Sequence, residues 1–223
     1  MTELGARRMP SWPQAEKTQI DQLRELAVAL LSDNMHRGTG SLGISPYHKP
    51  SKWTMAGTAV TVRTRGGDNL LTLRALDYCR PGDVLVIDAG GDVSNAIVGG
   101  IITAGAAMLG LAGMVLDGAI RDVAEIRERE FPVYARGVSH RGPYKNGPGE
   151  INVPVCIGGM VVQPGDIIVG DQDGLLAFPA SEAATLIQQA LVQQGKEQQQ
   201  MDEINQGRWD RSFIAALEAR AVN

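Results

Sequence analysis

Along the first third of the chain, segments whose apolar positions have the periodicity of a helix alternate with segments that have the periodicity of a strand. Between residues 14 and 31, apolar side chains recur every three or four positions, which predicts an amphipathic helix that Ser32-Asp33-Asn34 ends. Residues 57–63 alternate as in a strand, and residues 84–87 are wholly apolar, as in a strand buried on both faces. A helix over 68–79 separates the two. This alternation predicts an α/β protein.

One segment is apolar enough to raise the question of a membrane span. Ala96–Leu116 is uncharged over 21 residues, which is long enough to cross a bilayer. Glycines interrupt it, however, including Gly110 and Gly113. We therefore favour a buried helix over about 100–109, capped by the first of these glycines, and a buried strand over 113–116. No membrane partner is expected.

The rest of the chain predicts short strands followed by long helices. The strands are expected at 132–136, 153–157, 167–170 and 175–178. Ala, Gln and Glu dominate from Ser181 to Met201, which predicts a long exposed helix, and a last helix is expected from about Arg211 to Ala219. Because no linker divides it, the chain is expected to form a single domain over 1–223, with an N-terminal helix (about 14–31) and C-terminal helices (about 181–220).

Composition narrows the class of protein. Aromatic residues make up 4% of the 223 residues, so the core must be built from aliphatic side chains. A net charge of −4 and a pI near 5.4 argue against a nucleic-acid or anionic-membrane surface. Cys79 and Cys156 form no Cys-x-x-Cys pair, and residues 1–10 lack the apolar core of a signal peptide. We expect a cytoplasmic protein that binds no nucleic acid.

Charge is concentrated in the segment Val115-Leu116-Asp117-Gly118-Ala119-Ile120-Arg121-Asp122-Val123-Ala124-Glu125. We expect a buried strand that ends at Asp117, a glycine turn, and a helix from about Asp122, and strand ends of this kind bind ligands in α/β proteins. A capping box formed by Asp122 and Glu125 explains the carboxylates equally well. It leaves Arg121 unexplained, because a cation is disfavoured at the positive end of a helix unless an anionic ligand is present.

Two glycines enter the predicted helix at 100–109. Free N–H groups at such a helix start bind carboxylate or phosphate, and Gly99 and Gly100 would let a ligand come close. Close packing of the helix against a neighbour would favour glycine equally.

Two further kinds of site have weaker support. The loop Asp88-Ala89-Gly90-Gly91-Asp92 loosely resembles nucleotide-binding loops, but the Gly-x-Gly-x-x-Gly spacing is absent. The histidines His36, His48 and His140 are scattered, so any metal is expected to be a hard ion bound by carboxylates, such as Mg²⁺ or Mn²⁺.

The order of these motifs resembles a known family. Gly99-Gly100-Ile101-Ile102 is followed by Gly110-x-x-Gly113-Met-Val-Leu-Asp117-Gly118-Ala-Ile-Arg121-Asp122-x-x-Glu125. Asn152-Val153-Pro154-Val155, the run from Pro164 to Asp171, Asp173-Gly174 and Lys196-Glu197 continue the likeness. Over roughly Ser32 to Gln206 the chain resembles the RraA-like proteins, which include regulators of ribonuclease activity and 4-hydroxy-4-methyl-2-oxoglutarate aldolases.

The resemblance implies a layered β/β/α sandwich of the swivelling-domain type, assembled as a homotrimer or as a homohexamer built from two trimers. It also implies a divalent-metal lyase that acts on a small 2-oxo acid and releases pyruvate.

The resemblance also assigns roles to residues of this chain. Asp122 would bind Mg²⁺ or Mn²⁺, and Arg121 would contact the keto oxygen of the substrate. The backbone N–H groups of Ile101 and Ile102, next to Gly99 and Gly100, would hold the substrate carboxylate. Glu197 would reach the water shell of the metal from a neighbouring subunit.

One position departs from the pattern of the family. Aldolases of this family usually carry Asp or Glu where this chain has Gly100, and that carboxylate is the natural base for the C4 hydroxyl of the substrate. Decarboxylation of oxaloacetate gives the same pyruvate enolate and needs no such base. The sequence therefore supports the metal and enolate half of the site better than the aldolase half.

We accordingly expect a metal-dependent C–C lyase, either an aldolase or an oxaloacetate-type decarboxylase. The alternative is a non-catalytic regulator that binds a protein partner, and a methyltransferase comes third. Arg121, Asp122 and Glu197 favour the enzyme, because a pure binding protein does not need them.

Overall fold

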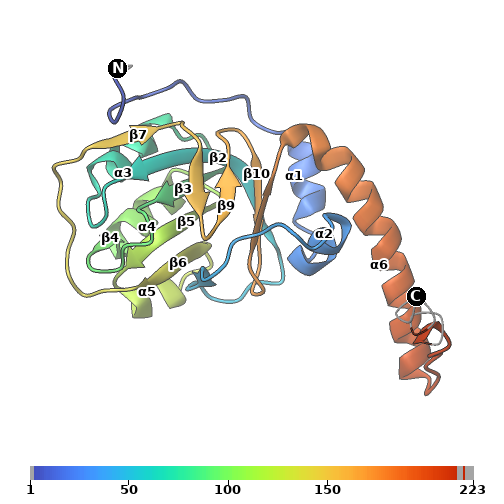
Figure 1. Cartoon of the computed structure of the whole chain (residues 1–223). Coiled ribbons are helices and arrows are strands. Elements are labelled where there is room, and N and C mark those ends of the chain that lie inside the picture. Colours follow the sequence, from blue (N-terminus) through green and yellow to red (C-terminus); the bar gives the residue numbers. More distant parts are fainter. Residues whose placement is uncertain (1–2, 215–217, 219–223) are drawn as a thin grey trace.

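The computed structural model describes residues 3–214 and residue 218. A nine-stranded sheet forms its centre, with the order β1-β6-β5-β3-β2-β10-β11 and with β4 and β7 paired to β5 and β2 (Figure 1). Its strands are β1 (Ser45–Pro46), β2 (Met55–Thr64), β3 (Asp83–Asp88), β4 (Ala96–Val98), β5 (Gly113–Ile120), β6 (Val133–Val138), β7 (Gly149–Ile151), β10 (Ile167–Gly170) and β11 (Leu175–Phe178).

Helices and a two-stranded ribbon surround this sheet. The ribbon consists of β8 (Val155–Ile157) and β9 (Met160–Val162). The helices are α1 (Lys17–Leu23), α2 (Val28–Asn34), α3 (Leu70–Ala75), α4 (Gly100–Met108), α5 (Val123–Arg127) and α6 (Ala183–Asn205). Short 3₁₀ turns follow α3 at Leu76–Tyr78 and precede α6 at Ala180–Glu182.

The central strands are parallel and buried on both faces. Successive residues of β3 enter different cores: Leu85 and Ile87 pack with side chains of α3, α4 and α5, whereas Val84 and Val86 pack with the β8–β9 ribbon. Because both faces are covered, the strand has no polar alternation, as its sequence predicted. The layers are therefore helices, sheet and ribbon, and the prediction of a layered α/β fold is confirmed.

A second core lies at the β10–β11 end of the sheet. Side chains of α1, α2 and α6 pack there against Ile167, Val169 and Phe178. Only the first half of α6 takes part, through buried residues that end at Ala190, and the rest of the helix extends away from the body of the protein (Figure 1). The long helix expected over 181–201 is confirmed, with four buried side chains on one face.

The prediction of one N-terminal helix over 14–31 is wrong in one respect, because two helices, α1 and α2, form this segment. The backbone is extended at Ala27 (ψ 144°), between α1 and α2. Thr54 binds the carbonyl groups between the two helices. Its N–H donates to the carbonyl of Arg24 at 3.0 Å, and its hydroxyl donates to the carbonyl of Leu26 at 2.7 Å. The N–H of Val28 donates to Asp171 at 2.8 Å. These long-range partners replace helical hydrogen bonds, and local periodicity does not reveal them.

Strand β5 is longer than its sequence suggested. We expected it to end at Asp117 with a glycine turn after it, but it continues to Ile120, and Gly118 lies within the strand. The Asp117 carboxylate is buried, where it forms an ion pair with Arg136 and accepts the N–H of Gly158 at 2.7 Å. This pairing joins β5, β6 and the β8–β9 turn, so Asp117 has a structural role.

Three more differences concern short or peripheral elements. Sequence analysis missed the short strands β1, β4, β7 and β9, and the strand expected at 153–157 begins two residues later, at Val155. Part of the last helix expected over 211–219 lies outside the described residues, at 215–217 and 219. No helix among the described residues is both long and apolar enough to span a membrane.

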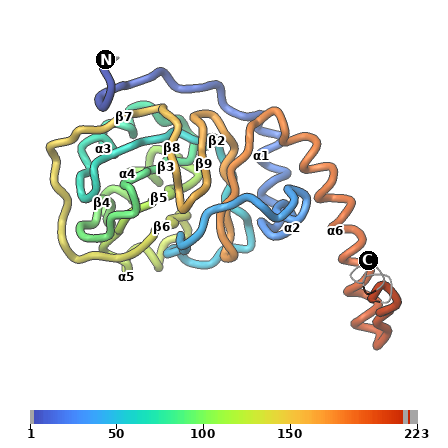
Figure 2. Tube along the Cα trace, viewed as in Figure 1, coloured from blue at the N-terminus to red at the C-terminus, as the bar shows by residue number. Residues whose placement is uncertain are grey.

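Backbone hydrogen bonds hold the N-terminal segment on the sheet. The N–H of Ile151 in β7 donates to the carbonyl of Arg7 at 2.9 Å, and the N–H of Met9 donates to the carbonyl of Ile151 at 3.1 Å. Figure 2 shows this segment passing above β7, along the upper edge of the sheet, before it reaches α1. Glu150, next to it, accepts Arg7 at 2.5 Å and Arg63 at 3.2 Å, and the Arg7 hydrogen bond holds the pKa of its carboxyl below the usual range.

The loop over residues 139–148 is fastened from beneath by Asp68. This carboxylate is fully buried, and it accepts the N–H groups of Asn146 at 2.7 Å, Gly147 at 2.9 Å and Leu70 at 3.0 Å. One buried acceptor therefore fixes both the start of α3 and the loop that passes over the N-terminus of α4.

Replacement of Asp68 tests this anchoring role. Asp68→Asn removes acceptor capacity from buried N–H groups, so we expect the free energy of unfolding in urea to fall by ~1–3 kcal/mol. Asp77→Asn is the matched control, because Asp77 is exposed and paired with Arg74 on the surface, and it should change stability by no more than ~0.5 kcal/mol. Equal effects of the two substitutions would contradict the role given to Asp68.

Candidate functional site

A small cavity of about 40 Å³ opens where α4 begins and β5 ends. It is lined by Asn69, Ala96, Ile97, Val98, Gly99, Ile101, Ile102, Arg121, Asp122 and Pro143. Residues that the sequence singled out in two separate segments thus meet here. Gly99, Ile101 and Ile102 come from the start of α4, and Arg121 and Asp122 follow β5. The parallel sheet is the reason, because the C-terminal end of β5 and the crossover helix α4 lie at one edge of it.

Asp122 is the carboxylate of this cavity. It is the N-cap of α5 and has the left-handed backbone conformation (φ 60°), which Asp tolerates better than most residues. Its side chain makes no capping hydrogen bond to α5; instead Oδ2 accepts the N–H of Gly100 at 2.9 Å. The capping box that we considered for Asp122 and Glu125 is therefore wrong, and the carboxylate lies at the N-terminus of α4.

Gly99 leaves room for this arrangement. A Cβ on Gly99 would lie 2.5 Å from Oδ2 of Asp122 and 2.9 Å from Cγ of Arg121, closer than real Cβ contacts occur. The φ of Gly99 is −145°, a value that any residue adopts, so the requirement is for space alone. Of the two explanations that the sequence left open for this glycine, these contacts support close packing against a neighbouring segment, because the approaching groups belong to the protein itself.

Arg121 reaches across the cavity from the end of β5. Its N–H donates to the carbonyl of Val98 at 3.0 Å, and its Nε lies 3.7 Å from Oδ2 of Asp122, with the side chain less than half exposed. The Asp122 carboxylate thus offsets part of the repulsion that the helix dipole exerts on this cation. Among the described residues, Asp122 is the only ionic partner of Arg121, which leaves the guanidinium able to bind an anion.

The first turn of α4 adds two donors. The N–H of Gly100 is used by Asp122 and that of Thr103 by the carbonyl of Gly99, but the N–H groups of Ile101 and Ile102 have no acceptor among the described residues. The Ile101 side chain is 88% exposed, so it does not close the approach. Two free amides and a guanidinium make a recess that suits a carboxylate.

Asn69 is a cavity residue that sequence analysis missed. Its side chain is buried, and Nδ2 donates to the carbonyl of Ile97 at 3.2 Å, which leaves Oδ1 without a hydrogen-bond donor among the described residues. Buried acceptors normally have a partner, so an unpartnered one beside a cavity points to a ligand or a water molecule as donor. No sequence signal distinguishes it, because a polar residue before a helix is expected as a cap.

At Gly100, where the chain departs from the aldolase pattern, a side chain of another element lies where a Cβ would be. A Cβ on Gly100 would overlap Oε2 of Glu125 and lie 2.7 Å from its Cδ. The carboxylate of α5 therefore occupies the volume that a side chain at position 100 would take.

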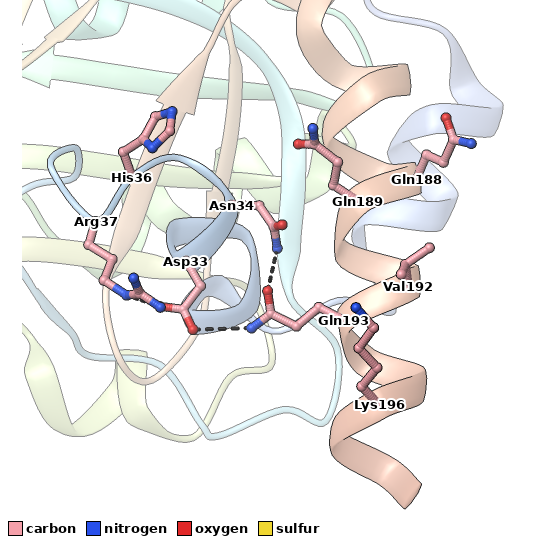
Figure 3. A pocket seen from close by; sticks show the side chains of 9 residues that line it. All are labelled: Asp33, Asn34, His36, Arg37, Gln188, Gln189, Val192, Gln193 and Lys196. Atoms are coloured by element: carbon pink, nitrogen blue, oxygen red, sulfur yellow. Dashed lines mark hydrogen bonds and ion pairs between the residues drawn. The ribbon is translucent and has the colours of Figure 1, made fainter. Parts of the chain in front are cut away.

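Glu197 lies apart from these residues. It is exposed on α6, where Oε1 accepts Nε2 of Gln193 at 2.8 Å, and α6 and the α4–α5 region are at opposite ends of the protein (Figure 1). Gln193 is in turn bonded to Asp33 and Asn34 of α2, at 3.1 and 2.8 Å, along a wide polar pocket of about 780 Å³ (Figure 3). Glu197 and Asp122 are not brought together within one chain.

Asp88, from the glycine loop that follows β3, has a structural role. Asp88 accepts the N–H groups of Gly90 at 2.9 Å and Cys156 at 3.1 Å, so the glycine loop after β3 is closed by its own carboxylate. Among the described residues, no group of three or more His, Cys, Asp or Glu side chains could hold a metal.

Comparison with known proteins agrees with the motifs. Residues 28–177 match the family model described as Aldolase/RraA, RraA-like. The chain is 39% identical, over 186 residues, to a Halalkalibacterium halodurans protein named "Putative 4-hydroxy-4-methyl-2-oxoglutarate aldolase", covering 83% of this chain and 88% of that protein.

Solved structures share the fold. An uncharacterized protein from Pseudomonas syringae superposes with a TM-score of 0.79 at 26% identity, covering 89% of this chain and 93% of that one. The RNA-processing inhibitor RraA from Thermus thermophilus gives a TM-score of 0.63 at 32% identity, covering 70% and 93%. On the match over 28–177 and the conserved architecture, the chain belongs to the RraA-like family.

Proposed function

We propose that this protein is a divalent-metal-dependent C–C lyase that acts on a small 2-oxo acid and releases pyruvate. The observation that carries the proposal is the convergence of Asp122, Arg121 and the free N–H groups of Ile101 and Ile102 on one cavity. The substrates that we expect are 4-hydroxy-4-methyl-2-oxoglutarate, by retro-aldol cleavage, and oxaloacetate, by decarboxylation.

The arrangement of donors matches the two ends of a 2-oxo acid group. The N–H groups of Ile101 and Ile102, at the positive end of α4, hold the carboxylate. Arg121 then faces the adjacent keto oxygen, where negative charge develops as the C3–C4 bond breaks. A preorganised cation at that position stabilises the transition state more than the ground state.

The donor set also fits a hard divalent ion. Asp122 offers a single carboxylate, and Mg²⁺ is commonly held by one or two carboxylates while it keeps several waters. A divalent ion bound at Asp122 supplies Lewis-acid polarisation of the substrate oxygens. Since one chain supplies no larger cluster among its described residues, we propose that Glu197 of a neighbouring copy completes the outer shell. This requires a homo-oligomer, either a trimer or a hexamer.

The non-catalytic alternative explains less of the geometry. A regulator that binds a protein partner would not require Gly99 to make room for the Asp122 carboxylate, nor two amides left free beside Arg121. The Thermus thermophilus relative is an RNA-processing inhibitor, so a regulator can have this fold, but the cavity of this chain favours the enzyme.

Metal removal tests the proposed reaction. Pyruvate release from both substrates should be abolished by a chelator and restored by Mg²⁺ or Mn²⁺, and Asp122→Ala should stay inactive at moderate metal concentration because its carboxylate ligand is gone. The measurement is a coupled pyruvate assay together with titration of Mn²⁺ binding. Full activity of the chelated protein would rule out the metal mechanism.

Two glycines of the same region provide a matched control. Gly99→Ala should weaken Mn²⁺ binding and activity, because its methyl group displaces the Asp122 carboxylate. Gly105→Ala, within α4, meets no atom within 4 Å and should leave both unchanged while stabilising the helix by up to ~1 kcal/mol. If the two variants behave alike, Gly99 does not position the site.

The shared site can be tested by mixing two impaired proteins. Glu197→Ala should lower activity by ~10–100-fold, the usual effect of losing a group that supports a metal ligand. Asp202→Asn is the control, since Asp202 accepts Gln198 on α6 in the same way as Glu197 accepts Gln193. Hetero-oligomers of Asp122→Ala and Glu197→Ala subunits should regain activity, because some sites then hold both wild-type residues. Failure to regain it in isolated hetero-oligomers, or full activity of a monomer, would contradict the model.

A further inference from the structure

The carboxylate of Glu125 lies over the first residue of α4, although it belongs to α5. Built on the backbone of Gly100, a Cβ would overlap Oε2 of Glu125 and sit 3.0 Å from its Oε1. The carboxylate thus borders the amide turn that we assign to the substrate carboxylate. Gly100 itself is buried and has no side chain, so Glu125 supplies the acidic group at this point.

One oxygen of this carboxylate is held and the other is free. Oε1 accepts the guanidinium of Arg129 at 2.6 Å, one helical turn further along the chain. Oε2 has no donor among the described residues, and the Glu125 side chain is 51% exposed. The ion pair fixes the direction of the carboxylate and leaves Oε2 open to a ligand.

Retro-aldol cleavage requires a proton acceptor for the C4 hydroxyl of the substrate. The C4 hydroxyl of a 4-hydroxy-2-oxo acid loses its proton and becomes a carbonyl, the C3–C4 bond breaks, and its electron pair moves into the C2 carbonyl to form the pyruvate enolate. C3 then takes up a proton and pyruvate leaves. Asp122 already accepts the N–H of Gly100 and serves the metal in our proposal, and the neutral amide of Asn69 is not a base.

We propose that Glu125 is the general base of this step, with Oε2 accepting the proton of the C4 hydroxyl. The proposal rests on the lyase function set out above and assigns the proton acceptor of its retro-aldol reaction. It replaces the expectation, drawn from Gly100 alone, that the chain lacks an acceptor for the hydroxyl proton. Decarboxylation of oxaloacetate involves no hydroxyl proton, so the two reactions should depend on Glu125 to different degrees.

Glu125→Gln is the first test. A positioned general base contributes ~10²–10⁴-fold, so kcat for 4-hydroxy-4-methyl-2-oxoglutarate should fall by at least ~10²-fold. The decarboxylation of oxaloacetate should fall by ~10-fold or less, so that the ratio of the two activities shifts. Glu128→Gln, an exposed carboxylate one turn away, is the matched control and should leave both reactions unchanged. Parallel losses in the two reactions of Glu125→Gln would overturn the proposal.

A transplanted carboxylate is the second test. Glu125→Ala vacates the space over Gly100, so the double variant Gly100→Asp/Glu125→Ala places an acid there from the opposite direction, at a helix start that favours it. We expect the double variant to recover aldol cleavage at least ~10-fold over Glu125→Ala. No recovery, with Mn²⁺ binding and thermal stability intact, would overturn the role of Glu125. If the wild-type protein releases pyruvate from neither substrate, the lyase function itself fails.

Discussion

The hydrogen bond from the N–H of Gly100 to the Asp122 carboxylate determines the rest of the site. It ties the start of α4 to the turn between β5 and α5, two segments that are 22 residues apart in the chain. Two features make the bond possible: the absence of a side chain on Gly99 and the left-handed backbone of Asp122. A non-glycine residue in that conformation is uncommon, and such residues concentrate at functional sites.

The layered fold explains why these groups can be held so closely. Strands β3 and β5 are buried between the helices and the β8–β9 ribbon, so their ends are fixed from both faces. Asp117 pairs with Arg136 beneath the site, and Asp68 fastens the loop above it. The cavity thus lies between elements that buried packing and paired carboxylates hold in place, and preorganised donors of this kind favour catalysis.

The sequence predicted the elements with strong periodicity and the charged segment at the end of β5, because those signals are local. It did not reveal that β5 continues through Gly118, since the burial of Asp117 depends on Arg136 and on the distant turn at Gly158. Asn69 and Glu125 were missed as site residues for the same reason: each looks like an ordinary helix-start residue until tertiary contacts place Asn69 in the cavity wall and Glu125 over Gly100.

Gly99 and Gly100 show which part of a close contact the sequence can predict. Their adjacency to a helix start indicated close approach, but the sequence left open whether a ligand or the protein does the approaching. In the structure Asp122 and Arg121 occupy the space over Gly99, and Glu125 occupies the space over Gly100. The glycines therefore admit acidic groups from a neighbouring segment, and in our proposal the ligand is bound by the amides that follow them.

The central claim is that a 2-oxo acid binds at the start of α4 with its metal on Asp122. A crystal structure of the protein with Mn²⁺ and oxalate, an analogue of the pyruvate enolate, tests this most directly, because anomalous scattering locates the metal. We predict Mn²⁺ on the Asp122 carboxylate, an oxalate carboxylate on the N–H groups of Ile101 and Ile102, and Glu197 of a second copy facing the metal waters. Mn²⁺ and oxalate bound elsewhere, with the Asp122 cavity empty, would contradict the account.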